Sequence, residues 1–262
     1  MSAKFREVGS GPGVVCLHSN ASSASQWRPL MENLAPSFHV LAADSYGAGK
    51  SPSVPKDRPL RLRDEVALLE PVFARAGDPF ALVGHSYGAA VALIAAVMRP
   101  DRVRALALYE PTLFALIDAD SPPPNDADGI RNAVAMGAAA LDAHDPSAAA
   151  RFFIDFWMGS GAWNRMPQQR KGPIETSIAN VRDWAGALFE EPTPLRAFGE
   201  LRIPVLYMLG ENSPASSRGV ARLLAPVLPR VEVVKFAGLG HMGPVTHPEV
   251  VNDAICSFLA RA

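Results

Sequence analysis

A serine between two glycines is the first group in this chain that could carry out covalent chemistry. It is Ser86, in the pentapeptide Gly-His-Ser-Tyr-Gly at 84–88, with an apolar run at 80–83 before it and another at 89–98 after it. The pentapeptide therefore joins an expected strand to an expected helix. Glycine on either side lets strand and helix pack closely, while the hydroxyl stands clear of the sheet near a helix N-terminus. In this context the pattern predicts a nucleophile rather than a structural Gly-Ser turn.

A serine hydroxyl needs a general base to become a good nucleophile, and His241 fits that role. It lies in a glycine-rich loop at 238–243, directly after the last expected strand and before the last expected helix. Position, loop composition and chain order agree with those of a histidine that takes the proton of a serine. His247 is interpreted as a helix-entry residue, and no comparable context surrounds His39, His85 or His144.

Short apolar runs along the chain have the length and composition of buried strands in a parallel sheet. They occupy residues 14–17, 40–43, 80–83, 103–109, 205–209 and 231–236, and helical segments at 27–34, 62–75, 86–98, 216–228 and 249–259 separate most of them. This alternation predicts the α/β fold class, a mostly parallel sheet with helices on both faces. Ligands of such sheets bind beyond the carboxyl ends of the strands, where Ser86 and His241 are expected.

One long segment, residues 112–198, contains no convincing strand. After a Pro-rich loop at 121–125 it has helical patches at 129–143, 146–157 and 173–189. A helical insertion of about 85 residues predicts a lid, since a loop of that length without structure of its own is uncommon. We therefore expect an α/β core of residues 1–111 and 200–262 and a helical cap of residues 112–199.

The loop after the first expected strand, at 18–23, consists mainly of small residues whose backbone N–H groups can point into a cleft. Asn20 is the candidate for one N–H donor of an oxyanion hole, and Tyr87 is the candidate for the other. The alternative for Asn20 is a plain turn residue. His18 is expected to orient this loop rather than to take part in the chemistry.

Together these motifs resemble the α/β-hydrolase family, in its capped bacterial branch, over nearly the whole chain. The resemblance rests on the 17–20 loop, Asp44-x-x-Gly-x-Gly-x-Ser, the pentapeptide at 84–88, Gly240-His241, Pro248 and the closing apolar residues 255–259. It implies the fold of that family and serine-hydrolase chemistry that needs no metal or organic cofactor. The serine at position 86 excludes the dehalogenases and epoxide hydrolases of this fold, which use an aspartate there.

The acid of the expected triad departs from the pattern of many relatives, which carry an aspartate in a Gly-x-x-Asp turn after the next-to-last strand. In this chain Ser213 occupies that position and cannot supply a carboxylate. Glu110, at the end of the strand after the 86–98 helix, is the strongest replacement, because haloalkane dehalogenases are among the branches that use an acid there. Two alternatives are Glu110 as a strand-end carboxylate facing solvent or the cap, and Glu211 as the acid.

The expected cap is rich in large apolar side chains, and we expect Trp157, Trp163 and Trp184 to line a substrate pocket. Such a pocket favours a small-to-medium hydrophobic ester, thioester or lactone, cleaved through an acyl-enzyme. The alternatives are a carbon–carbon bond hydrolase of the same fold and a protein that binds a hydrophobic small molecule without turnover. The lack of an aspartate at position 213 favours the binding protein, and the intact Ser86 and His241 argue against it.

Composition sets limits on the class of protein. The chain has 262 residues, 48% of them hydrophobic and 19% charged, which is typical of a well-cored globular protein. A net charge of −1 without like-charge runs gives no sign of a nucleic-acid or membrane partner. Cys16 and Cys256 lack metal-ligand spacing, and no signal-peptide or membrane-span pattern is found. We expect a cytoplasmic protein without a metal site that acts on a hydrophobic small molecule; a homodimer is left open.

Overall fold

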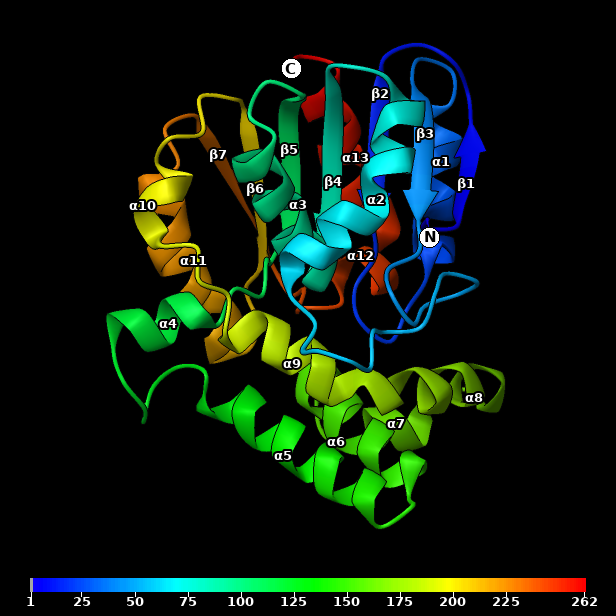
Figure 1. Ribbon diagram of the computed structural model, residues 1–262, viewed down its shortest axis with the longest axis vertical. Coiled ribbons are helices and arrows are strands. Elements are labelled where there is room, and N and C mark those ends of the chain that lie inside the picture. Colours follow the sequence, from blue (N-terminus) through cyan, green and yellow to red (C-terminus); the bar gives the residue numbers. More distant parts are fainter. Residues whose placement is uncertain (1) are drawn as a thin grey trace.

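The computed structural model describes residues 2–262, which form one seven-stranded sheet with helices on both faces (Figure 1). The strands are β1 (Phe5–Val8), β2 (Gly13–Leu17), β3 (His39–Ala43), β4 (Phe80–His85), β5 (Val103–Tyr109), β6 (Val205–Gly210) and β7 (Val231–Phe236). Their order across the sheet is β1-β3-β2-β4-β5-β6-β7, and β1 alone pairs antiparallel with its neighbour. The α/β fold class predicted from the sequence is confirmed.

The two faces of the sheet pack into two hydrophobic cores, because successive side chains of a strand point to opposite sides. On β4, Leu82 belongs to the core beneath α2 (Leu62–Ala76), α3 (Tyr87–Met98) and α11 (Ala215–Val227). Its neighbours Ala81 and Val83 belong to the core beneath α1 (Arg28–Leu34) and α13 (Pro248–Leu259). Both faces of the central strands are therefore covered, as their continuous apolar sequences predict.

Strand β1 is the element that the sequence analysis does not predict. All four of its residues are exposed, with Phe5 at 40% and Val8 at 38% of their full exposure. The strand lies at the edge of the sheet and pairs only with β3. Because it buries no apolar run, the signal that identifies the other strands is missing.

Seven α-helices and the 3-10 helix Ile178–Asn180 lie between β5 and β6, and the largest of them gather beyond the carboxyl ends of the parallel strands (Figure 1). The α-helices are α4 (Ala115–Asp120), α5 (Asp128–Asp142), α6 (Pro146–Met158), α7 (Ala162–Arg165), α8 (Gln168–Ser177), α9 (Val181–Phe189) and α10 (Leu195–Phe198). Helices α5–α9 form a helical insertion in which α5 packs against α6. The division of the chain into a core and a cap at residues 112 and 199 stays a prediction.

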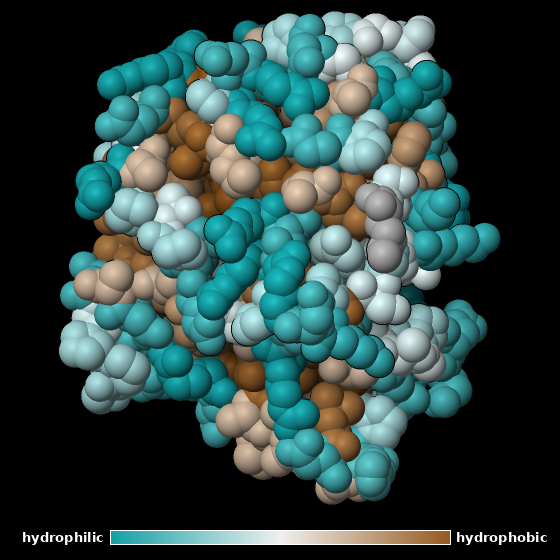
Figure 2. Space-filling model, in the orientation of Figure 1, coloured by the Kyte–Doolittle hydropathy of each residue, from teal (hydrophilic) through white to brown (hydrophobic). Residues whose placement is uncertain are grey.

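The surface seen in Figure 2 is mostly hydrophilic, with apolar side chains showing between the polar ones over both the sheet layer and the insertion. Such scattered apolar exposure is ordinary for a globular protein. None of the helices formed by residues 2–262 combines the length and the apolar character that crossing a membrane requires.

Candidate active site

Ser86 lies on a strained turn between β4 and α3. Its backbone φ of 57° and ψ of −116° put a residue other than glycine at a positive φ, a conformation that clusters at functional sites. The glycines on either side are required by close contacts. A Cβ on Gly84 would lie 2.5 Å from Ala89 Cα, and a Cβ on Gly88 would lie 2.3 Å from the carbonyl oxygen of Leu17. The glycine spacing therefore allows this turn to form.

Ser86, His241 and Glu110 form a continuous chain of hydrogen bonds. The Nε2 atom of His241 lies 2.9 Å from Ser86 Oγ, and its Nδ1 atom lies 2.7 Å from Glu110 Oε2. All three side chains are buried. Because a carboxylate only accepts, the hydrogen-bond network assigns the ring proton to Nδ1 and leaves Nε2 to accept from the serine hydroxyl.

Glu110 is held as an ionised group within the protein. Its Oε1 atom accepts from the backbone N–H of Gly210 at 2.8 Å and from the hydroxyl of Ser213. Burial raises the pKa of the Glu110 carboxyl, but these hydrogen bonds and the one from His241 outweigh burial and bring that pKa below its ordinary value. Glu211, by contrast, is exposed and makes no hydrogen bond to His241 within residues 2–262. The geometry favours Glu110 over the alternatives considered from the sequence.

The backbone N–H groups without an acceptor near the turn, within residues 2–262, include those of Asn20, in the loop after β2, and Tyr87, the first residue of α3. Buried His18 fixes the Asn20 loop, because its Nδ1 donates to the carbonyl oxygen of Ser19 at 2.7 Å and its Nε2 accepts from the N–H of Ser45 at 3.1 Å. Free, oriented donors of this kind can stabilise a negatively charged oxygen.

His85 has a structural part in the site that the sequence analysis does not find. Its Nε2 donates to the carbonyl oxygen of His241 at 2.8 Å, and its Nδ1 accepts from Gln26 Nε2 at 3.0 Å. Gln26 in turn accepts from the backbone N–H and the hydroxyl of Ser19, both at 3.1 Å. Burial, together with the nearby His241, brings the pKa of His85 well below its ordinary value, so the ring is neutral. The network links the base loop to the loop that carries Asn20.

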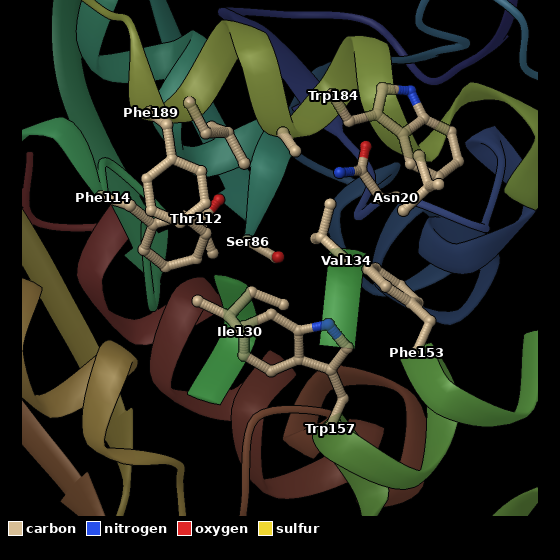
Figure 3. Close-up of a pocket in the computed structure, with 13 residues that line it drawn as sticks. Asn20, Ser86, Thr112, Phe114, Ile130, Val134, Phe153, Trp157, Trp184 and Phe189 are labelled. Carbon is tan, nitrogen blue, oxygen red and sulfur yellow. The ribbon is translucent and has the colours of Figure 1, made fainter. Parts of the chain in front are cut away.

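A narrow apolar pocket opens beside Ser86 (Figure 3). The empty space between its lining side chains, including the part open to solvent, is about 340 Å³. Within the part of the chain that the structure describes, no charged side chain lines it, and no group of three or more His, Cys, Asp or Glu side chains is placed to hold a metal ion. The lining residues are Asn20, Ser86, Thr112, Phe114, Ile130, Val134, Phe153, Trp157, Val181, Trp184, Ala185, Leu188 and Phe189.

Two of the three tryptophans expected in the pocket line it. Trp157, on α6, stacks on the imidazole of His241 with ring centroids 3.8 Å apart and an interplanar angle of 25°. Trp184, on α9, faces the pocket from the side opposite Trp157 (Figure 3). The expectation for Trp163 is wrong. The short helix α7 buries that side chain outside the pocket, with Lys171 Nζ 5.2 Å from its ring centroid.

A second buried carboxyl, Glu65 on α2, contacts the side chain of Tyr87, the residue that follows Ser86. It accepts from the Tyr87 hydroxyl and from the backbone N–H of Tyr46, both at 3.1 Å. Burial raises the pKa of Glu65 from 4.5 to about 7, against the opposing effect of those two hydrogen bonds. Folding therefore strengthens proton binding at Glu65, and its contribution to stability is lost as the pH rises from 4.5 through 7.

We expect Glu65→Gln to remove this pH dependence. A neutral amide can accept from Tyr46 and donate to the Tyr87 oxygen, so the contacts of protonated Glu65 are kept. The difference in the free energy of unfolding between variant and wild type should be no more than about 1 kcal/mol at pH 5. It should reach at most about 3 kcal/mol in favour of the variant at pH 8. Urea unfolding at both pH values measures it, and a difference that does not change with pH would contradict the expectation.

Comparisons with known proteins found matches over nearly the whole chain. The model of the alpha/beta hydrolase family matches residues 14–254. An (E)-2-((N-methylformamido)methylene)succinate hydrolase of Acinetobacter baylyi is 24% identical over 98% of this chain and 94% of its own length. A pimeloyl-[acyl-carrier protein] methyl ester esterase of Nitrosomonas europaea is 26% identical over 95% of this chain and 96% of its own. The crystal structure of an alpha/beta hydrolase from Sphaerobacter thermophilus is 26% identical, with a TM-score of 0.73 over 98% of this chain and 96% of that chain.

Proposed function

Because the chain belongs to the alpha/beta hydrolase family, we propose that it is a serine hydrolase with Ser86, His241 and Glu110 as its catalytic triad. The observation that carries this proposal is the hydrogen-bonded chain from Ser86 Oγ through His241 to Glu110, which ends beside an uncharged pocket. The substrate class that fits is a small-to-medium hydrophobic ester, thioester or lactone.

In the first half of the proposed reaction, Ser86 Oγ attacks the substrate carbonyl carbon and His241 Nε2 takes the serine proton. The carbonyl oxygen becomes negative and accepts hydrogen bonds from the free N–H groups of Asn20 and Tyr87. Glu110 stabilises the imidazolium that forms. The imidazolium then donates its proton to the leaving alcohol or thiol, and the acyl group stays on Ser86.

In the second half, a water molecule attacks the acyl carbon and gives its proton to His241 Nε2. The tetrahedral intermediate collapses, Ser86 regains its proton from the imidazolium, and the carboxylic acid leaves. Of these transfers, the one between Ser86 Oγ and His241 Nε2 runs along a hydrogen bond that the structure already contains. Trp157, stacked on His241, supplies an apolar cover that limits water around the imidazole.

The names of two relatives state substrates of different charge, and the uncharged lining of the pocket favours the neutral one. The Acinetobacter baylyi relative is a hydrolase of a substituted succinate, a dicarboxylate, whereas the Nitrosomonas europaea relative is a methyl ester esterase. Burying a carboxylate without a positive partner is costly, and the lining residues within 2–262 include no cation. We therefore propose a neutral ester for this chain rather than a dicarboxylate.

A matched pair of methyl esters tests this proposal. Methyl pentanoate and monomethyl succinate differ in that a carboxylate replaces the terminal ethyl group. We expect kcat/KM for methyl pentanoate to be at least about 10²-fold higher, because the charged ester brings an unpaired carboxylate into the apolar pocket. Acid release in a pH-stat measures both rates. Equal rates, or a preference for the succinate, would contradict the neutral-ester proposal, and no turnover of any ester would favour a binding protein.

A further inference from the structure

Thr112 is a polar residue of the pocket that the proposed reaction does not use. It follows β5 and lines the pocket with Ser86. The residue is 1% exposed, and its Oγ1 atom has no hydrogen-bond partner within residues 2–262. A buried hydroxyl is nearly always paired, so an unpaired one next to a reacting centre calls for a physical explanation.

The other two polar residues of the pocket are accounted for. The Ser86 hydroxyl is paired with His241 at 2.9 Å. The Asn20 side chain is partly exposed, so water can hydrate its amide. Thr112 has neither a protein partner nor access to bulk solvent.

We propose that Thr112 Oγ1 is a substrate-binding hydroxyl that hydrogen-bonds a second, uncharged oxygen of the substrate, separate from the carbonyl that Ser86 attacks. This inference rests on the proposed function and narrows its substrate class to neutral esters that carry an additional ether, carbonyl or hydroxyl oxygen. A hydroxyl can donate to any of these and can also accept from an alcohol. A carboxylate is not included, because no cation lines the pocket within the described residues.

Thr112 lines the same pocket as Ser86, so its hydroxyl can meet a second oxygen of a substrate whose carbonyl carbon lies at Ser86 Oγ. In the view of Figure 3, Thr112 lies between Phe114 and Ser86, with Asn20 on the opposite side of Ser86. The walls near Thr112 are otherwise apolar. A substrate with an alkyl group where the second oxygen would lie therefore leaves the Thr112 hydroxyl unpaired. A pocket of this kind discriminates between two ligands of equal shape that differ in one oxygen atom.

Three esters of nearly equal shape test the inference as ligands. Butyl butyrate is the reference, 2-methoxyethyl butyrate has an ether oxygen on the alcohol side, and butyl methoxyacetate has one on the acyl side. Dissociation constants are measured by calorimetry in the non-hydrolysing variant Ser86→Ala and in the double variant Ser86→Ala with Thr112→Val. Valine has the shape of threonine without the hydroxyl. We expect the first variant to bind one ether ester about 3- to 10-fold more tightly than butyl butyrate, and the double variant to lose that preference.

Controls separate this result from a general effect on the fold. Ser177 also has a buried, unpaired hydroxyl but does not line the pocket, so Ser177→Ala in the Ser86→Ala background should keep the preference. Thr112→Ser, which restores a hydroxyl, should keep it too. The same preference with and without Thr112, or no binding of any of the three esters, would overturn the inference. Hydrolysis of butyl butyrate by the wild type tests the proposed function separately.

Discussion

Glu110→Gln is expected to fold normally and to lose about 10²- to 10⁴-fold in kcat. The reason lies in the donors around the carboxylate. Glu110 Oε1 accepts from Gly210 and Ser213, while Oε2 accepts from His241 Nδ1. In the variant the single amide oxygen turns toward the two donors, and the NH₂ group then faces His241. The imidazole must place its proton on Nε2, where it can no longer accept the proton of Ser86.

The neighbouring carboxylate provides the control for this prediction. Glu211 is exposed on the turn after β6, two residues before Ser213. Glu211→Gln removes a negative charge from the same region without touching His241, so its kcat should stay within about 2-fold of the wild type. Steady-state hydrolysis of butyl butyrate compares the two variants. A large loss in Glu211→Gln with near-normal activity in Glu110→Gln would remove Glu110 from the triad.

Ser86→Ala is expected to have the largest effect on turnover, a loss of about 10⁴- to 10⁶-fold in kcat. The substitution removes the only atom that the proposed mechanism joins to the acyl group. The free N–H groups of Asn20 and Tyr87 remain, so a small rate above that in water should persist. Ser86 has a φ of 57°, and alanine should meet the same backbone strain there as serine does, so the stability of the variant should be close to that of the wild type.

The turn at Ser86 and its pairing with His241 could be predicted from sequence because each depends on local pattern. Gly84 and Gly88 flank Ser86 at the spacing that the close approach of Ala89 and Leu17 requires. Glu110 could be predicted because position 213 lacks a carboxylate. The structure adds the physical link between the two positions, since the Ser213 hydroxyl donates to the Glu110 carboxylate. Ser213, at the position where many relatives carry the acid, therefore helps to hold the carboxylate that we propose as the triad acid.

Features that depend on distant contacts could not be read from the sequence. His85 is next to Ser86, but its partners are Gln26 and the carbonyl of His241, far away along the chain. Trp157 and Trp163 both lie on helices of the insertion, and only the packing of α6 and α7 decides that the first covers the site and the second does not. The unpaired hydroxyl of Thr112 is visible only once its surroundings are known.

Activation of Ser86 is the central claim, and intact mass spectrometry after exposure to a fluorophosphonate tests it most directly. This reagent reacts covalently with a serine that a base has activated. Ser217 supplies a matched control, because its hydroxyl lies 3.3 Å from His241 Nδ1, on the side of the ring away from Ser86. We expect one adduct on the wild type and on Ser217→Ala, and none on Ser86→Ala. A folded wild type without an adduct, or an equal adduct on Ser86→Ala, would contradict the account.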